Sequence, residues 1–191
     1  STTASYITAV GHEAAENNTA SYNTALGWQA LQGASGNITG GNNTGLGIVT
    51  LKNLTSGTAN TASGIGAMRD TTTGSYNVAN GTNALVFNTG GSYITAIGNE
   101  SLNKSTTASY NTAVGFKSLF ENTTGTFNIA IGPEACRNIT TGGKHIGIGY
   151  KALYSTQTSS NNIAIGYEAL YSNTAAATLV AIGYRSQKYS T

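Results

Sequence analysis

The residues of this chain best suited to hydrolytic chemistry are its carboxylates, because glycoside hydrolysis needs a close pair of them. The seven are Glu13, Glu16, Asp70, Glu100, Glu121, Glu134 and Glu168. Glu100, Glu134 and Glu168 alternate with cations at an even spacing, which indicates ion pairing at a surface. Glu13 and Glu16 could be neighbours, but no third polar group supports catalysis there. We therefore expect no catalytic site and no enzyme activity.

Cysteine and histidine are too scarce to form a metal centre or a catalytic pair. Cys136 stands alone, so no intrachain disulfide can form, and it occupies a position that leucines take elsewhere. A buried small hydrophobic residue fits that position better than a nucleophile does. His145 stands where other parts of the chain have asparagine, and His12 has no partner. No cluster has zinc-ligand spacing and no phosphate-binding or dinucleotide-binding motif is present, so we expect no metal and no cofactor.

Composition argues against several classes of protein. Charged residues make up 8% of the chain and the formal net charge is +2, so no basic stripe predicts a nucleic-acid partner. No run of about 18 apolar residues predicts a membrane span. The first residues have neither the basic nor the apolar segment of a signal peptide. A hydrophobic share of 39%, regularly placed, argues against disorder.

A repeat of 17 residues organises this composition. An Ala-Ile-Gly phrase or a close variant recurs, and its glycines follow one another at that spacing: Gly98, Gly115, Gly132, Gly149, Gly166 and Gly183. In the first half we place the landmark glycines at Gly11, Gly27, Gly47, Gly66 and Gly81, with spacings of 16, 20, 19 and 15. We therefore predict one repeat domain over residues 1–191, with irregular coils over 1–97 and regular coils over 98–185.

The residues before each landmark glycine alternate as they would in a β-strand. β-branched residues two apart, such as Ile129 and Ile131, flank a small residue, here Ala130. A face of small residues indicates that another backbone approaches closely. We therefore expect this small face to meet a second chain, and Ala130→Leu to disrupt assembly. The Ala152-Leu153 pair and its equivalents supply a second apolar anchor in each coil.

These features predict an all-β fold, a β-solenoid of the β-roll or β-helix type with about eleven coils. The many Gly, Thr and Asn residues argue against a helical repeat. A coil of this length spans about 56 Å of extended chain at about 3.3 Å per residue, which after the corners leaves room for two short strands. Coils about 4.8 Å apart would form a rod of roughly 50 Å. Lateral association through the small face predicts a parallel homotrimer.

Stacking places equivalent positions of successive coils side by side. The second position after each glycine alternates in charge at every step: Glu100, Lys117, Glu134, Lys151, Glu168 and Arg185. Opposite charges on neighbouring strands stabilise by about 0.2–1 kcal/mol per pair, so this charge ladder supports the register. A further column holds Asn111, Asn128, His145 and Asn162, where stacked asparagine side chains can hydrogen-bond along the stack.

Aromatic residues also recur in columns. Our candidate surface or receptor contacts are Trp28, Tyr150, Tyr154, Tyr167, Tyr171 and Tyr184. Exposed aromatic rings of this kind stack on sugars or anchor protein partners. The alternative is that these rings pack at the seam between chains.

Two phrases carry a resemblance to known proteins. Residues 111–119 read N-T-A-V-G-F-K-S-L, and residues 162–170 read N-I-A-I-G-Y-E-A-L. They resemble the head repeats of trimeric autotransporter adhesins and, more closely, repeats of bacteriophage tail fibres, from about Tyr6 to Arg185. The resemblance implies a trimeric β-roll fibre that works in attachment. Adhesin head repeats are usually shorter than the 17 residues found here.

The leading hypothesis is a structural and adhesive fibre segment, a fragment of a longer fibre, located in a virion or at the cell surface. Its expected partners are further copies of itself, neighbouring fibre domains, and a host-surface glycan or protein. The first alternative is a monomeric Thr-rich ice-binding solenoid, although the threonine column changes to Ile129, Ile146 and Ile163. A polysaccharide-degrading tailspike is the weaker alternative, for want of a carboxylate pair.

Overall fold

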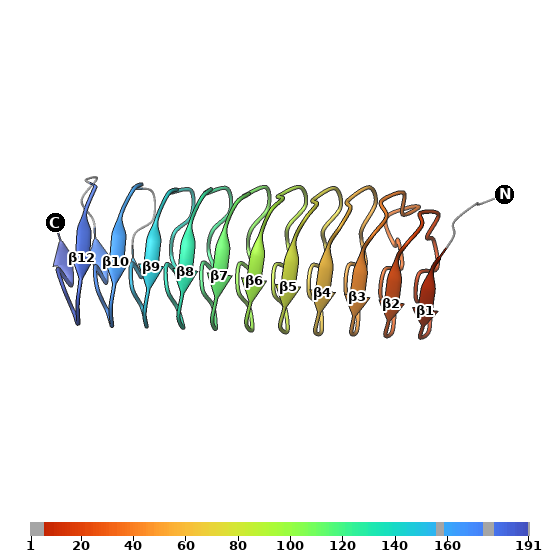
Figure 1. Cartoon of the computed structure of the whole chain (residues 1–191), viewed down its shortest axis with the longest axis horizontal. Coiled ribbons are helices and arrows are strands. Elements are labelled where there is room, and N and C mark those ends of the chain that lie inside the picture. Colours follow the sequence, from red (N-terminus) through yellow and green to blue (C-terminus); the bar gives the residue numbers. More distant parts are fainter. Residues whose placement is uncertain (1–5, 156–158, 174–177, 191) are drawn as a thin grey trace.

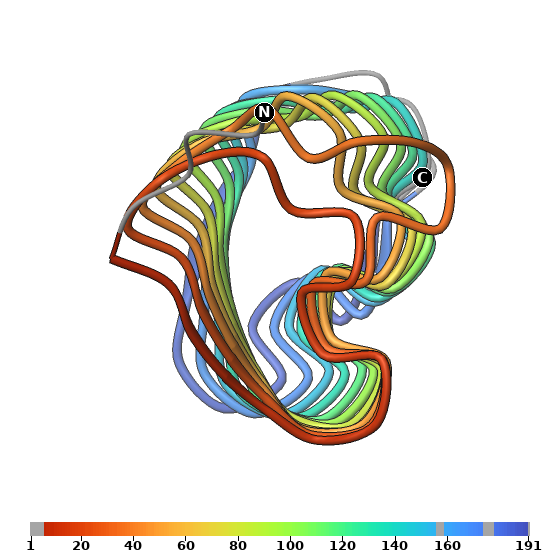
Figure 2. The same cartoon turned by 90° about the vertical axis from the view of Figure 1, so that its right-hand side faces the viewer.

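The chain forms a rod of stacked coils. The computed structural model describes residues 6–155, 159–173 and 178–190. Figure 1 shows the coils side by side, and Figure 2 shows them superimposed along the long axis. Each coil contributes one short strand to a parallel sheet of 11 strands, which follow one another in sequence order over about ten turns. The predicted all-β solenoid is therefore confirmed.

Every strand of this sheet is three residues long. The strands are β1 (Thr8–Val10), β2 (Thr24–Leu26), β3 (Thr44–Leu46), β4 (Thr61–Ser63), β5 (Val78–Asn80), β6 (Thr95–Ile97), β7 (Thr112–Val114), β8 (Ile129–Ile131), β9 (Ile146–Ile148), β10 (Ile163–Ile165) and β12 (Val180–Ile182). Near the C-terminal end, β11 (Ser172–Asn173) and β13 (Tyr189–Ser190) form a separate parallel pair.

The strand register corrects one landmark of the sequence repeat. Thr44 pairs with Thr61 and Thr61 pairs with Val78, so the spacing of 17 residues already begins at β3. The glycine that follows β4 in the landmark column is Gly64, and our placement of the landmark at Gly66 was wrong. Only the first two intervals depart from the repeat. Figure 2 shows the corresponding early coils leaving the path that the later coils share.

The prediction of two strands per coil holds only for the last two coils, where β11 and β13 pair. In the other described coils, tight turns form the rest of the coil. In the coil after β6, Glu100, Leu102 and Tyr110 have positive φ values of 55°, 47° and 58°. A non-glycine residue in this left-handed region loses about 1–2 kcal/mol. Backbone hydrogen bonds between coils continue through these turns, as from Leu102 N–H to the Ser118 carbonyl at 3.0 Å. This continuous pairing holds the strained residues in place.

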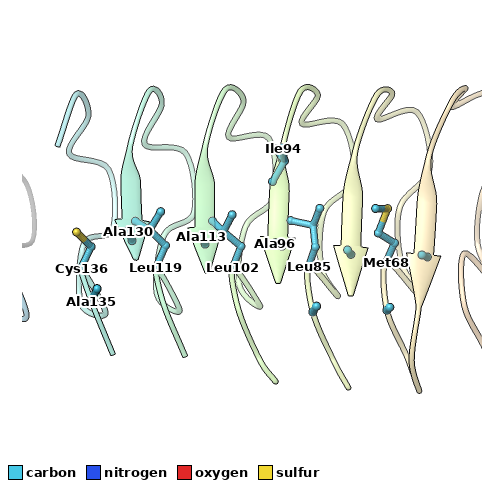
Figure 3. Packing of buried hydrophobic residues seen from close by; sticks show 14 of the residues in the cluster. Met68, Leu85, Ile94, Ala96, Leu102, Ala113, Leu119, Ala130, Ala135 and Cys136 are labelled. Atoms are coloured by element: carbon cyan, nitrogen blue, oxygen red, sulfur yellow. The ribbon is translucent and has the colours of Figure 1, made fainter. Parts of the chain in front are cut away.

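The core lies inside each coil, between the strand and the turn that follows it. Figure 3 shows leucines such as Leu102 and Leu119 pointing toward the strand alanines. Ala113, Ala130, Leu102 and Leu119 are all fully buried. The small face therefore packs against side chains of its own chain, and our expectation that it meets another chain was wrong. Replacing Ala130 would disturb the coil itself.

The landmark glycines are required where consecutive coils approach most closely. Gly115 has a φ of 132°, and a Cβ atom there would lie 2.6 Å from the carbonyl carbon and oxygen of Gly132. The same contact recurs up the stack, with Gly166 and Gly183 at the C-terminal end. No side chain fits at that distance, so glycine is required where consecutive coils pack this closely.

Candidate interaction surfaces

The first surface is the outer side of the parallel sheet, which we call the sheet face. It comprises the first and third residue of each strand, the residue two before each strand, and the residue after each landmark glycine. In β8, Ile129 and Ile131 are 38% and 39% exposed, whereas Ala130 between them is buried. Because side chains alternate along a strand, burying the alanine column turns the larger β-branched column outward.

Exposed hydrophobic residues concentrate on this sheet face. Among the described residues, only Phe87 and Tyr189 of the exposed large hydrophobic residues lie elsewhere. Those on the sheet face are Tyr6, Val10, Tyr22, Leu26, Trp28, Leu46, Ile48, Ile65, Tyr76, Val78, Tyr93, Ile97, Tyr110, Phe116, Phe127, Ile129, Ile131, Tyr167, Val180, Ile182 and Tyr184. The sheet face thus carries exposed apolar side chains from β1 to β12, interspersed with polar ones such as Thr44, Ser63 and Asn80.

The second surface, the turn surface, comprises the second, fifth and sixth residues after each landmark glycine. It holds every charged residue of the chain except Lys144: Glu13, Glu16, Lys52, Arg69, Asp70, Glu100, Lys104, Lys117, Glu121, Glu134, Arg137, Lys151, Glu168, Arg185 and Lys188. Charge and apolar surface are therefore segregated on two different sides of the coil.

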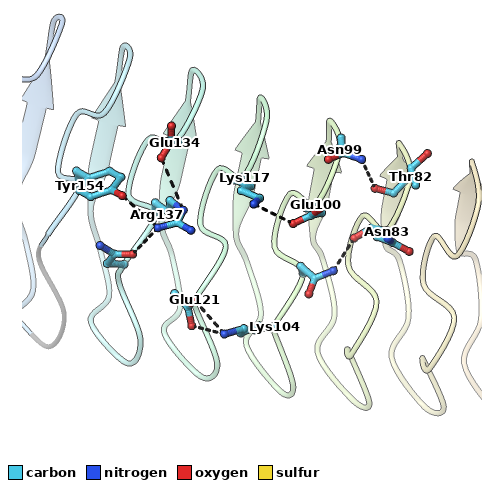
Figure 4. Close-up of polar contacts among 12 residues, drawn as sticks. Thr82, Asn83, Asn99, Glu100, Lys104, Lys117, Glu121, Glu134, Arg137 and Tyr154 are labelled. Carbon is cyan, nitrogen blue, oxygen red and sulfur yellow. Dashed lines mark hydrogen bonds and ion pairs between the residues drawn. The ribbon is translucent and has the colours of Figure 1, made fainter.

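The six residues of the charge ladder form pairs on this turn surface. The ion pairs are Glu100–Lys117 at 3.4 Å, Glu134–Lys151 at 3.9 Å and Glu168–Arg185 at 2.8 Å. Figure 4 shows the first of them beside the neighbouring Lys104–Glu121 pair. Hydrogen bonds from Lys188 and Arg185 hold the pKa of Glu168 below its ordinary value.

The aromatic candidates from the sequence divide between the two surfaces. Trp28 follows a landmark glycine, as do Tyr150, Tyr167 and Tyr184, which stack with centroids 5.1 and 5.4 Å apart. These four residues lie at the edge of the sheet face. Tyr154 and Tyr171 stack at 5.1 Å on the turn surface, where the ammonium group of Lys151 lies 5.2 Å from the Tyr154 ring. The charge ladder borders both groups, because the Lys151 ammonium also lies 5.1 Å from the Tyr150 ring.

A longer aromatic column escaped the sequence analysis. Tyr76, Tyr93, Tyr110 and Phe127 stack at the corner where the chain enters each strand, with successive centroids 5.1, 5.1 and 4.9 Å apart. Each ring is about half exposed, at 50–55%. The signal was present, since these residues recur every 17 positions. Their column extends the apolar sheet face at its second edge.

The asparagine column is buried and satisfies backbone groups. The Asn111 side-chain oxygen accepts a hydrogen bond from the Asn128 N–H at 2.8 Å, and its amide donates to the Gly125 carbonyl at 2.8 Å. His145 continues the pattern: Nδ1 accepts from the Asn162 N–H at 3.2 Å, and Nε2 lies 2.7 Å from the Ser159 carbonyl oxygen. These contacts fix a neutral imidazole with its proton on Nε2, and burial lowers its pKa.

The remaining chemical groups are also held in structural contacts. Gln32 Nε2 donates to both Glu13 and Glu16 at 2.8 Å, so an amide bridges these two carboxylates. Cys136 is fully buried, and burial raises the pKa of its thiol. Within residues 6–155, 159–173 and 178–190, no group of three or more His, Cys, Asp or Glu side chains could hold a metal ion.

Comparison with known proteins yields no matching family model, no matching curated protein and no matching solved structure. In the described part of the chain, no helix is long and apolar enough to cross a membrane. The features that can engage a partner are therefore two parallel surfaces, one apolar and one charged, each repeated along the rod.

Proposed function

We propose that this chain is a segment of a trimeric fibre, in which three parallel copies pack through their sheet faces and form a rigid shaft. The fibre contributes to attachment at a host or other surface, as part of a phage tail fibre or a cell-surface adhesin. Neighbouring fibre domains and a host-surface glycan or protein are its further partners. It acts by binding and by stiffness, without catalysis.

The observation that carries this proposal is the sheet face, on which nearly all exposed large hydrophobic residues of the described chain gather. Ten turns at about 4.8 Å and a width of about six residues at about 3.3 Å give a face of roughly 1,000 Å². The largest apolar patch on a monomeric protein is typically about 300–600 Å². A stable protein–protein interface buries about 800 Å² per partner. The sheet face therefore has the size of an interface.

A second copy of the same chain is the partner that matches this surface best. Its coils have the same spacing, so the outward columns of two parallel chains can stay in step along the whole rod. The sheet face holds a single charged residue, Lys144, so its burial desolvates few charges. The turn surface stays in solvent, where its ion pairs keep the assembly soluble.

The resemblance to adhesin head repeats and tail-fibre repeats supports the number three and the role in attachment. The phrases at residues 111–119 and 162–170 lie across β7 and β10, so they include the outward residues of the sheet face. The rod shape supports a shaft, because each coil adds length at a constant cross-section.

The mass of the particle in solution tests the proposal. Light scattering on a size-exclusion column should give a mass near three chains with an elongated shape. A monomeric mass at micromolar concentration would overturn the trimer and with it the shaft.

A matched pair of lysine substitutions locates the interface. Ile148→Lys puts a charge on the sheet face, and we expect it to yield monomers with unchanged circular dichroism. Asn138→Lys places the same charge on the turn surface of the preceding coil and should leave the mass unchanged. Equal masses for the two variants would exclude the sheet face as the contact.

One observation favours the ice-binding alternative. Thr8, Thr24, Thr44 and Thr61 form an outward column over the first four strands of the flat sheet. Val78 breaks this column, and from β8 onward the long sheet has Ile129, Ile146, Ile163 and Val180 in its place. Thermal hysteresis of the Ile148→Lys monomer, which exposes this column fully, tests the alternative. Activity there that the assembled protein lacks would favour ice binding.

A further inference from the structure

A polar break interrupts the sheet face near its middle. The third residue of each strand in the long sheet is aliphatic in every strand except β4 and β5, where it is Ser63 and Asn80. The column after the landmark glycines is polar one coil later, with Thr82 after β5 and Asn99 after β6, whereas Ile65 after β4 is 51% exposed. Polar residues thus occur in three adjacent coils, and the β5 coil is polar in both columns.

The side chains of Ser63 and Asn80 take no part in the hydrogen bonding among the described residues of their own chain. Neither Ser63 nor Asn80 makes a side-chain hydrogen bond to any residue in the described part of the structure. Asn80 is exposed and points outward from the sheet, whereas Ala79 before it is buried. Asparagine is also a poor strand former, so coil stability does not explain its presence. Its donors and acceptors are available to another chain.

A repeat fibre has an alignment problem that such a break can solve. Because the coils are nearly identical, one chain could slide along its neighbour by one coil, about 4.8 Å, and still match column to column. A uniform aliphatic face would accept each of these slipped alignments with little change in contact. A fibre with unequal chain heights would then present ragged ends to its neighbouring domains.

We propose that Ser63 and Asn80 form an axial register key that aligns the chains of the assembly at equal height. This inference rests on the proposed lateral assembly of parallel copies. At equal height the Asn80 amides of the three chains meet and hydrogen-bond to one another. A slip by one coil places Asn80 against Ile97 or Ser63 of the neighbour. An unpaired buried amide disfavours the slipped state by roughly tenfold to a hundredfold.

The repeat allows the key to be moved without changing composition. Ile131 and Ile148 occupy the same column as Ser63 and Asn80, four coils further along. The moved-key variant carries Ser63→Ile, Asn80→Ile, Ile131→Ser and Ile148→Asn. The keyless variant carries only the first two substitutions. All four positions lie on the outer side of the sheet, so each coil keeps its own core.

Co-refolding of two differently tagged chains, followed by native mass spectrometry, tests the key. Tagged and untagged wild-type chains should mix statistically. Moved-key and wild-type chains should each form trimers alone, while mixed trimers fall by roughly tenfold or more, because each mixed trimer buries unmatched amides at two heights. The keyless variant should form mixed trimers with wild-type chains and with moved-key chains more readily than wild-type and moved-key chains do with each other.

Statistical mixing of moved-key and wild-type chains would overturn the register key and leave the trimer intact. Absence of trimers in the wild type would instead overturn the proposed function. If the moved-key variant does not fold, as judged by circular dichroism, the simpler exchange Asn80→Ile with Ile148→Asn replaces it. That exchange should still deplete mixed trimers, and statistical mixing would again refute the key.

Discussion

At the scale of single residues, this fold depends on a few demanding positions repeated in every coil. Most coils hold three non-glycine residues in left-handed backbone conformations, and a Cβ atom on each landmark glycine from Gly11 to Gly166 would lie within 3 Å of the next coil. The buried asparagines compensate by accepting a backbone N–H that no strand partner reaches. For substitutions at these positions, the coil geometry therefore predicts whether the protein becomes more or less stable.

His145 should make the fold sensitive to acid. Its pKa is lowered from 6.5, because burial disfavours the charged ring. Below about pH 6.5 the unfolded state therefore binds more protons than the folded state. The free energy of unfolding decreases as the pH falls from there toward the lowered pKa of the folded state. Protonation would also place an N–H against the Asn162 N–H. His145→Asn, the residue type of this column, should lose less stability between pH 7.5 and 5.

Thermal unfolding of wild type and His145→Asn at both pH values measures this difference. Titration of the carboxylates changes the stability of both proteins equally, so it cancels when the two losses of stability are compared. An equal loss of melting temperature in the two proteins would contradict the role given to His145.

Val49 is the least suited residue in its column. It has a φ of 52°, which β-branched residues rarely adopt, whereas Asn83 holds the same place in another coil with a φ of 54°. Asparagine tolerates this conformation better. Val49→Asn should therefore stabilise the protein by about 1 kcal/mol, and Asn83→Val should destabilise it by a similar amount. Urea unfolding midpoints measure both, and shifts of the same sign would refute the argument.

At the scale of elements, the two halves of the long sheet differ in what they offer a partner. In the long sheet, the outward strand residues of β8, β9, β10 and β12 are all valine or isoleucine. In β1 to β7 the first strand residue is threonine except for Val78, and the third is aliphatic except for Ser63 and Asn80. The inward column stays alanine or glycine throughout. Coil folding therefore has the same basis in both halves, but the C-terminal half should contribute more to lateral assembly.

A reciprocal pair of substitutions tests this asymmetry. Thr112→Ile adds apolar surface to the sheet face of β7 and should tighten assembly by about 1–2 kcal/mol per chain. Ile146→Thr removes a similar area from β9 and should weaken assembly by a similar amount. The concentration dependence of the mass measures both. The same substitutions in the Ile148→Lys monomer control for effects on the coil, and unchanged assembly would count against the sheet face as interface.

At the scale of the whole molecule, the separation of charge from apolar surface assigns different tasks to the two sides of the rod. The Lys104–Glu121 pair on the turn surface joins atoms 2.8 Å apart, with side chains 46% and 31% exposed. Solvent-exposed pairs of this kind contribute about 0–1 kcal/mol. Lys104→Ala should therefore change stability by about 0.5 kcal/mol or less and leave the mass unchanged.

Salt provides the control for that variant. At about 1 M salt the difference between Lys104→Ala and wild type should vanish, because the Debye length falls to about 3 Å. A large difference that persists in salt, or a change in mass, would mean that the turn surface takes part in assembly.

Attachment should depend on the aromatic rings that stay outside the proposed interface. Tyr154 and Tyr171 stack on the turn surface beside Lys151 and the Arg137 guanidinium. Tyr154→Ser with Tyr171→Ser should reduce binding to a host surface severalfold at unchanged mass. Trp28→Ser, at the edge of the sheet face, should act mainly on assembly. Surface binding measured on the trimer separates the two, and full binding by the tyrosine variant would exclude this ring pair.

The sequence by itself determined the solenoid, because stacked coils need the same residue types at equivalent positions. Each coil offers the same environment at equivalent positions. This explains the spacing of Gly115 and Gly132, the buried column of Leu119 and Cys136, and the asparagine column that His145 joins. The landmark at Gly64 was missed, since Gly66 lies two residues away and glycine alone does not reveal the backbone conformation.

Only the tertiary structure decided which side of the strand faces outward. The alternation of Ile129, Ala130 and Ile131 is equally compatible with either side buried, because a strand shows the period but not the direction of the core. The space inside a coil decides it: Leu119 fills that space and leaves room for Ala130 but not for isoleucine. The same packing turns Asn80 outward, an orientation that the sequence pattern alone does not indicate.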